Sequence, residues 1–264
     1  MQFRSHRSAA LCIILCGMGV LLSGCSSPHP ITPPTPKSSP FQTVSLPPDG
    51  HSDLVRQGKL IFDQTPKYAS AYVGNRLSCS DCHLQSGTAA YSAPMIDIAN
   101  IFPMFNKRAG RVISMQERFQ ECFIRSENGR PLPNESQDMK ALTAYVDWLS
   151  REGVKGKPYK GRGFVKLPKL AGDPAKGKPI YASQCASCHG THGAGVPPIL
   201  PPVWGKDSYN NGAGMNNPKK MAAFLIRNMP QNHPGTLTPQ NALDVAYFIH
   251  SMPRPKFNQA YKGY

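Results

Sequence analysis

The residues most suited to chemistry in this sequence are two copies of the pattern Cys-x-x-Cys-His, CSDCH at residues 79–83 and CASCH at residues 185–189. This spacing is the attachment signature of haem c, because two thiols add to the haem vinyl groups and the adjacent histidine binds the iron. A zinc site of four thiolates, or a redox dithiol, would leave both histidines without a role. The sequence therefore predicts two covalent haem c groups. The residues that hold them are Cys79, Cys82, His83, Cys185, Cys188 and His189.

A lone cysteine, Cys122, lies in the segment ERFQECFIRSENGR. A leftover thiol in an exported chain indicates an intermolecular partner or a reactive thiol, and a haem in the same domain adds a third role, that of iron ligand. On a helix, Arg118 and Ser126 share its face, while Lys107 and Arg108 lie shortly upstream. Guanidinium groups around this thiol are expected to lower its pKa and to bind a divalent anion. The plain alternative is a small buried cysteine beside a solvated arginine face.

The N-terminal sequence predicts export. An apolar run at residues 11–24 follows two arginines and is too short to span a bilayer comfortably. It ends in LSGC, which resembles a bacterial lipobox and implies cleavage before Cys25 and acylation of that cysteine. Ordinary cleavage or an uncleaved anchor are the alternatives. We expect residues 1–24 to be a signal peptide and residues 25–49, rich in Pro and Ser, to be a tether. Ser26 then favours the outer membrane, on the periplasmic side.

The chain is strongly basic, with a formal net charge of +15. Such a charge is typical of proteins that bind nucleic acid, membrane surfaces or anionic partners. Export argues against nucleic acid, and most of the lysines are expected to form a solvated surface.

Helical periodicity predicts two similar all-α units with no strands. Helices are expected over residues 54–62, 112–126, 135–150, 174–183, 217–230 and 238–252, with Thr238 as an N-cap. The segment GKLIF before the first motif is echoed by GKPIY before the second. This plan resembles two class I cytochrome c domains in tandem. The predicted parts are domain 1 at residues 50–150, a linker at 151–172, domain 2 at 173–253 and a tail at 254–264.

The sixth iron ligands are predicted from position. For the second haem Met229 is favoured, because it ends a helix in the loop where class I cytochromes place their methionine. Its competitors are Met215, Met221, His192 and His233. In the first domain, no methionine occupies the corresponding position before the last helix. The methionines of this domain lie at other positions: Met95, Met104, Met115 and Met139. Cys122 is in the corresponding position, and a thiolate lowers a haem potential whereas a methionine raises it.

The segments CSDCH, ERFQECFIRSENGRPLP, MKALTAYVDWLS and FLIRNMP together resemble the dihaem thiosulfate dehydrogenases, over nearly the whole mature chain. That resemblance implies an exported dihaem cytochrome c that couples two thiosulfates to tetrathionate, or runs the reverse reaction. It implies His83 and Cys122 as ligands of the first haem, and His189 and Met229 as ligands of the second. Some relatives carry a lysine before that methionine as a switching ligand, whereas this chain has Asn228.

The resemblance also implies the residues that handle substrate. The arginines and the serine around the family's cysteine map to Arg108, Arg118 and Ser126. Thiosulfate would dock on the two arginines and bond to Cys122, and the electrons would pass to another small cytochrome. Two alternatives stand beside this function: a non-catalytic dihaem electron carrier, and the haem subunit of a sulfur-oxidising multienzyme complex.

Overall fold

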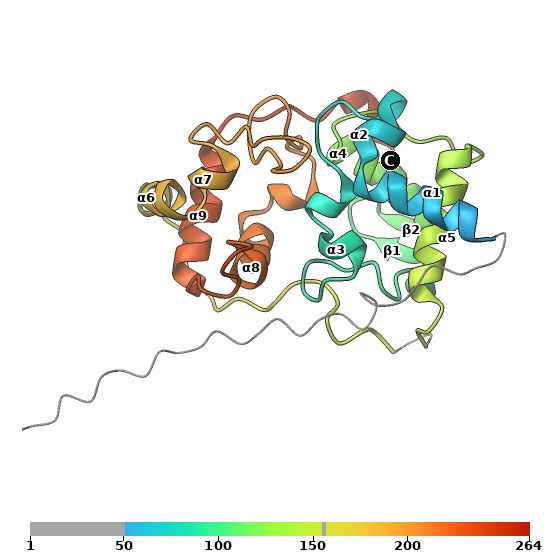
Figure 1. The fold of residues 1–264 in the computed structure, drawn as a ribbon, viewed down its shortest axis with the longest axis horizontal. Helices are drawn as coiled ribbons and strands as arrows, with labels where there is room; N and C mark the ends of the chain where they lie inside the picture. Colours follow the sequence, from blue (N-terminus) through green and yellow to red (C-terminus); the bar gives the residue numbers. More distant parts are fainter. Residues whose placement is uncertain (1–50, 155–156) are drawn as a thin grey trace, which may run out of the picture. The chain divides into compact units, whose positions relative to one another are not determined.

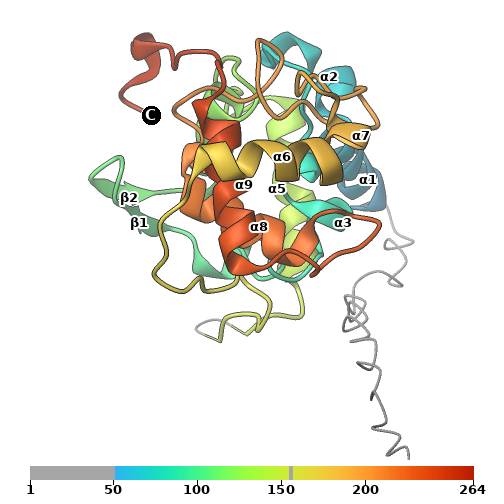
Figure 2. The same ribbon diagram turned by 90° about the vertical axis from the view of Figure 1, so that its left-hand side faces the viewer.

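A pair of packed helices frames each half of the chain (Figure 1). In the first half α1 (His51–Asp63) packs against α5 (Gln137–Ser150), and in the second half α6 (Pro174–Gln184) packs against α9 (Pro239–Ser251). Figure 2 shows α6 running across α9. Packing of the first helix against the last in each half agrees with the tandem class I cytochrome c plan that the sequence resembles.

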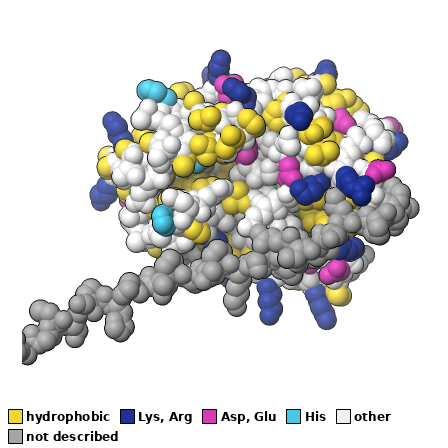
Figure 3. All heavy atoms as spheres, in the orientation of Figure 1, with side chains coloured by type: hydrophobic (Ala, Val, Ile, Leu, Met, Phe, Trp, Pro, Cys, Tyr) yellow, Lys and Arg dark blue, Asp and Glu magenta, His cyan; other side chains and the backbone are white. Residues whose placement is uncertain are grey.

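This computed structural model describes residues 51–154 and 157–264, which all belong to one compact unit. The predicted signal peptide and tether lie outside the described residues. Lys and Arg side chains project at many separate points of the face in Figure 3, as expected for a solvated basic surface. The remaining helices of four or more residues are α2 (Thr65–Tyr68), α3 (Leu84–Gly87), α4 (Met115–Arg125), α7 (Ala186–His189) and α8 (Pro218–Asn228). Short 3-10 turns occur at η1 (Ser70–Tyr72), η2 (Cys79–Asp81), η3 (Ala99–Ile101), η4 (Gly214–Asn216) and η5 (Gln259–Tyr261).

The repeated Gly-Lys pair has a packing role. A Cβ atom at Gly58 would collide with the carbonyl oxygen of Ala141 in α5. A Cβ atom at Gly177 would collide in the same way with the carbonyl oxygen of Asp244 in α9. Each glycine therefore lets its helix approach the closing helix of the same half, which explains the echo between GKLIF and GKPIY.

A short hairpin corrects the expectation that the chain has no strands. The antiparallel strands β1 (Met104–Asn106) and β2 (Arg111–Ile113) pair with each other, and Gly110 in their turn has a φ of 67°. The following helix, α4, begins at Met115 and not at residue 112. Its N-terminus is fixed by Ser114, whose hydroxyl accepts from the Glu117 backbone N–H at 3.1 Å.

Each half has its own hydrophobic core. In the first half Phe62, Leu142 and Tyr145 belong to one buried cluster. In the second half Tyr181 and Trp204, with ring centroids 4.8 Å apart, belong to another. The other predicted helices are confirmed to within a few residues, and Thr238 is confirmed as the N-cap of α9, where it accepts from Asn241.

The second half is hydrogen-bonded to α4. Buried Asn210 donates from Nδ2 to the Ile124 carbonyl at 2.8 Å and from its backbone to the Arg125 carbonyl at 3.1 Å. Arg125 in turn stacks on Phe257 and donates to the carbonyl of Tyr264 at 3.1 Å. The predicted C-terminal tail is therefore packed against the same helix that carries Cys122.

The segment predicted as a linker contains no helix or paired strand between residues 157 and 172, and it is nevertheless held in place. The carbonyls of Gly161 and Gly163 accept from the backbone N–H groups of Tyr91 and Ala93, at 2.7 and 2.9 Å. The domain limits drawn from the sequence stay predictions.

Candidate haem sites and active site

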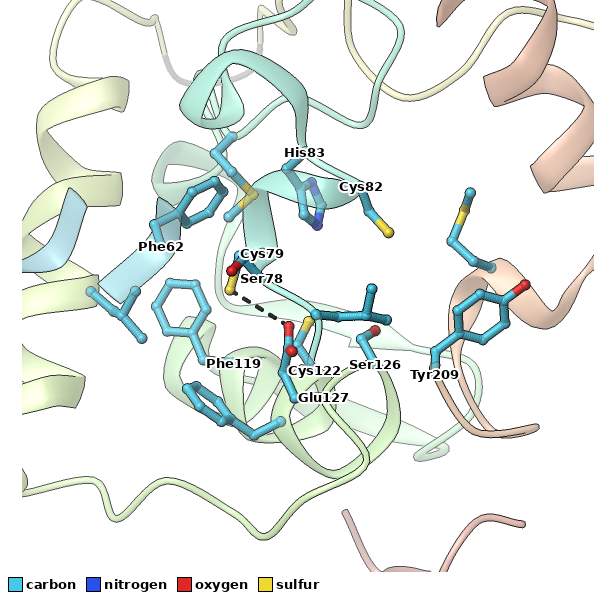
Figure 4. A pocket seen from close by; sticks show the side chains of 15 residues that line it. Phe62, Ser78, Cys79, Cys82, His83, Phe119, Cys122, Ser126, Glu127 and Tyr209 are labelled. Atoms are coloured by element: carbon cyan, nitrogen blue, oxygen red, sulfur yellow. Dashed lines mark hydrogen bonds between the residues drawn. The ribbon is translucent and has the colours of Figure 1, made fainter. Parts of the chain in front are cut away.

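The first Cys-x-x-Cys-His motif lies on a tight turn. Ser78 and Asp81 cap this turn reciprocally, with the Ser78 backbone donating to Asp81 Oδ2 at 2.8 Å. The backbone N–H of His83 donates to the Cys79 carbonyl at 3.0 Å. These bonds place Cys79, Cys82 and His83 on the wall of one cavity, which we call the cysteine cavity (Figure 4). Cys122 from α4 lines the same cavity.

The side chain of His83 is prepared to bind a metal. Its Nδ1 lies 2.6 Å from the Ala93 carbonyl, an arrangement in which Nδ1 carries the proton and Nε2 keeps its lone pair. Burial lowers the pKa of His83, with the nearby Arg118 cation acting in the same direction. The imidazole is therefore neutral, which is the form that ligates iron.

The walls of the cysteine cavity fit a haem. They are mostly apolar, with aromatic and aliphatic side chains from both halves of the chain. One buried carboxylate, Glu127, also lines it: Cys79 Sγ donates to Glu127 Oε1 at 4.0 Å, and Oε2 has no partner within the described structure (Figure 4). The apolar lining residues are Phe62, Leu77, Met95, Phe119, Phe123, Leu142, Tyr209 and Met215.

A separate cavity of about 310 Å³ contains the second motif, and we call it the second-motif cavity. Cys185, Cys188, His189 and Met229 all line it. The Nδ1 of His189 lies 2.9 Å from the Pro201 carbonyl, so this histidine repeats the arrangement of His83. Because the two cysteine pairs line different cavities, a single zinc site of four thiolates does not form.

Of the candidate sixth ligands for the second haem, Met229 is the one that lines the second-motif cavity. Met215 lines the cysteine cavity of the other half, and Met221 is buried in the second hydrophobic core. Neither His192 nor His233 lines the second-motif cavity. Met229 follows directly after α8, where its backbone N–H donates to the Leu225 carbonyl at 2.9 Å. Ligation by Met229 stays a prediction that this placement supports.

The two cavities are separated by the first motif. Cys79, Cys82 and His83 face the cysteine cavity, whereas the interleaved residues Ser80 and Asp81 line the second-motif cavity. The CSDCH turn is therefore a shared wall. A group held by this motif would be close to a group held by the second one.

Cys122 and its predicted neighbours meet on α4 and the hairpin. Ser126 lines the cysteine cavity together with Cys122. Arg118 Nη1 lies 2.8 Å from Glu121 Oε2, and Arg108 Nη1 lies 3.9 Å from Glu121 Oε1. The side chain of Glu121 is only 3% exposed, so a buried carboxylate brings the two predicted arginines together.

The expectation of a lowered thiol pKa is wrong. Burial raises the pKa of Cys122, and the Arg118 cation opposes this effect without reversing it. Glu121 and Glu127 raise the pKa further. The sequence shows the arginines and both glutamates near this cysteine, but it does not show how deeply the thiol is buried.

A third cavity, of about 370 Å³, adjoins the cysteine cavity, since His83, Met95, Phe119 and Cys122 line both. Its cationic lining residues are Lys107, Arg118 and Arg162, and we call it the cationic cavity. None of the residues lining it is an Asp or a Glu.

Several of these residues escape sequence reasoning. Glu121 is adjacent to Cys122, and its spacing of three residues from Arg118 is a helical ion-pair signal that could have found it. Tyr209 and Met215 reach the cysteine cavity from the second half, and no local pattern indicates that. Arg162 belongs to a segment without periodicity.

Within residues 51–154 and 157–264, no helix has both the length and the apolar character needed to cross a membrane.

Comparison with known proteins gives matches over both halves. The family model described as SoxA/TsdA, cytochrome c domain, matches residues 66–154, and the cytochrome c model matches residues 174–253. A thiosulfate dehydrogenase of Stutzerimonas stutzeri (strain A1501) is 42% identical, over 85% of this chain and 75% of its own length. A thiosulfate dehydrogenase of Thiomonas intermedia (strain K12) is 34% identical, over 96% of this chain and 87% of its own.

A solved structure also resembles this one, that of thiosulfate dehydrogenase (TsdBA) from Marichromatium purpuratum in its as-isolated form. The TM-score is 0.77 at 34% sequence identity, covering 85% of this chain and 49% of that chain. The present chain thus spans about half the length of that solved protein. The two family models together confirm the prediction of two cytochrome c domains in tandem.

Proposed function

This chain belongs to the thiosulfate dehydrogenase family of cytochrome c-type thiosulfate oxidoreductases, and from this premise we propose that it couples two thiosulfates to tetrathionate or runs the reverse reduction. One observation carries the proposal: Cys122 lines the same cavity as Cys79, Cys82 and His83, and it also lines the adjoining cavity that contains Arg118. A thiol that shares its cavities with a candidate iron ligand and with a cation suits a reaction that bonds sulfur to sulfur and releases electrons.

The residues present fit two haem c groups. Cys79 and Cys82 would hold the first, with His83 and Cys122 as iron ligands. The corresponding set for the second is Cys185, Cys188, His189 and Met229. Each haem, when bound, supplies a one-electron acceptor, so that the pair takes the two electrons released per tetrathionate. Cysteine ligation lowers the potential of the first haem and methionine ligation raises that of the second.

In the first step thiosulfate docks against Arg118 and Arg108, which neutralise its charge. Its outer sulfur forms a bond with the sulfur of deprotonated Cys122, which gives a Cys–S–S–SO₃⁻ adduct and releases two electrons that the two haems would accept. Ser126, which caps the C-terminus of α4, lines the cysteine cavity together with Cys122 and would donate a hydrogen bond to the substrate.

In the second step another thiosulfate attacks the adduct. Its outer sulfur bonds to the sulfur next to Cys122, the bond to Cys122 breaks, and the thiolate leaves with the electron pair. Tetrathionate is released, and Cys122 returns to its starting state. Once Cys122 is deprotonated, as ligation to iron would require, the atoms and charges of these two steps balance without further proton transfer. Run backwards, the same steps reduce tetrathionate.

The second haem, held at Cys185, Cys188, His189 and Met229, would be the exit for the electrons. Ser80 and Asp81 of the first motif line the second-motif cavity, which supports short-range transfer between the two haems. From there the electrons pass to a small cytochrome. Asn228 occupies the position before Met229 where some relatives carry a switching lysine. Its side-chain amide donates to the Phe224 carbonyl at 2.9 Å and to the Tyr91 carbonyl at 3.3 Å, so we propose no ligand switch at the second haem.

The decisive experiment is turnover of the purified single chain with an artificial redox partner, in both directions. We expect thiosulfate-dependent reduction of the acceptor with tetrathionate as the product. A chain that transfers electrons but never consumes thiosulfate or tetrathionate would be an electron carrier. Activity only toward sulfur bound to a carrier protein would instead indicate the haem subunit of a sulfur-oxidising complex.

Export and lipid anchoring are proposed from the sequence around Cys25, which lies outside the described residues. We propose a lipoprotein on the periplasmic side of the outer membrane. Replacing Cys25 by Ser should release the protein from membranes while its turnover remains. A wild-type protein found entirely in the soluble fraction would overturn this proposal.

A further inference from the structure

Arg162 lies in a segment that is fixed against the first half of the chain. The glycines on either side accept from the backbone of Tyr91 and Ala93, at 2.7 and 2.9 Å. A Cβ atom at Gly161 would lie 2.6 Å from that of Ala90, so this segment also approaches the first half closely. These contacts give the backbone of Arg162 a defined position although it lies in a segment without helix or strand.

That position is on the histidine side of the first site. The N–H of Ala93 bonds to Gly163, and the carbonyl of the same Ala93 accepts from His83 Nδ1 at 2.6 Å. Arg162 is therefore attached to the loop that orients the proximal histidine. Cys122 approaches the site from a different element, α4.

The chemistry of haem c indicates which part of the cofactor would face Arg162. A haem c has its two thioethers at one edge of the macrocycle and its two propionates at the opposite edge. Cys79 and Cys82 line the cysteine cavity and are absent from the cationic cavity, whereas His83 and Cys122 line both. A haem whose iron were bound by His83 and Cys122 would have its thioether edge in the cysteine cavity and its propionate edge toward the cationic cavity.

The charges of the cationic cavity suit that edge. Arg118 is already paired with Glu121 at 2.8 Å. Lys107 and Arg162 line the cavity and form no ion pair within the described residues, and no Asp or Glu lines it. Two unpaired cations would thus face the end of the cofactor that carries two carboxylates.

We propose that Arg162 forms an ion pair with a propionate of the first haem, which ties the segment between the two domains to the cofactor. This inference rests on the proposed haem at His83 and Cys122. A guanidinium beside the propionate stabilises the reduced haem, which carries one positive charge less than the oxidised haem. Arg162 therefore raises the potential of the first haem.

The test is a spectroelectrochemical titration of both haems, without thiosulfate, in wild type, Arg162→Gln and Arg162→Lys. We expect Arg162→Gln to lower the potential of the first haem and leave the second unchanged, with Arg162→Lys near wild type. Lys160→Gln is the matched control, because Lys160 is also exposed, lies two residues away and does not line the cavity. Covalent haem content and the ligand spectrum report whether each variant is folded.

Two results would overturn the proposal. One is a first-haem potential that is the same in Arg162→Gln as in wild type, in which case a rise in the KM for thiosulfate would assign this cation to the substrate. The other is an equal drop in Lys160→Gln, which would show a general effect of surface charge. Because the titration uses no thiosulfate, its outcome is independent of whether the proposed function is correct.

Discussion

Arg118 and Glu121 form an ion pair with 2.8 Å between Nη1 and Oε2, one turn apart on the helix that carries Cys122. Glu121 is buried and also accepts from Asn106 Nδ2 at 2.8 Å. The cation beside Cys122 is therefore held by a carboxylate that is itself anchored to the hairpin. This relationship fixes the direction of Arg118 before any substrate arrives.

Replacing Arg118 by Ala should weaken substrate handling while the haem spectra stay unchanged. Loss of a charge-assisted contact should lower kcat/KM. The fall should correspond to a loss of about 2–3 kcal/mol in transition-state stabilisation. Steady-state kinetics and visible spectra measure the two effects. Arg151→Ala is the control, since Arg151 bonds to the Trp148 carbonyl and Glu152 away from the site. Equal kinetics in the two variants would remove Arg118 from the mechanism.

Replacing Cys122 by Met should separate its role as an iron ligand from its role as a sulfur carrier. A thioether can still bind iron, so the first haem should remain low-spin with a raised potential. It cannot form the sulfur adduct, so turnover should be almost abolished. Cys122→Gly should be equally inactive with an open sixth position. Full activity in Cys122→Met would show that the thiol is only a ligand.

Replacing Cys79 and Cys82 together by Ala should remove about half of the covalent haem, because these thiols belong to one of two attachment motifs. Haem that resists organic extraction, measured per chain, provides the count. The pair Cys185 and Cys188 supplies the reciprocal variant, which should lose the other half. Loss of no haem in either variant would contradict two covalent sites.

Replacing Asn210 by Ala should destabilise the protein by about 2–3 kcal/mol. Asn210 is buried, and its amide bonds to Ile124, Asn128 and the backbone of Gly212. Truncation leaves buried carbonyl groups without donors. The free energy of unfolding from denaturant titration measures the loss. Half-buried Asn216, which makes one such bond, is the control and should cost less than about 1 kcal/mol when changed to Ala.

Replacing Glu117 by Ala should lower the free energy of unfolding by about 1 kcal/mol at neutral pH, because Glu117 completes the N-terminal cap of α4. The Ser114 backbone N–H, and secondarily Arg111, lowers the pKa of Glu117 below 4.5. A lowered folded-state pKa stabilises the protein above pH 4.5, and this contribution disappears as pH falls through the folded-state value.

The difference between wild type and Glu117→Ala should therefore shrink toward pH 3, as denaturant titration at the two pH values would show. Exposed Gln137→Ala, which removes no ionisable group, should show no such dependence. A difference that stays constant with pH would assign the effect to helix propensity alone.

The sequence by itself determined whatever depends on local chemistry. Covalent haem attachment needs only five consecutive residues, so the two motifs and their histidines could be recognised without coordinates. The helices follow from apolar periodicity and caps such as Thr238, which act within one or two turns. Met229 could be singled out as a candidate ligand because it lies at the end of a predicted helix.

Only the tertiary structure decided what depends on approach between distant segments. Burial, with smaller contributions from Glu121 and Glu127, reverses the expected direction of the Cys122 pKa, because desolvation depends on every element packed around a thiol. Met215 was a candidate ligand for the second haem, but the structure places it in the cysteine cavity. Its loop lies across the boundary between the two halves, which local sequence does not show. Arg162 reaches the first site through backbone hydrogen bonds, and side-chain periodicity carries no information about such bonds.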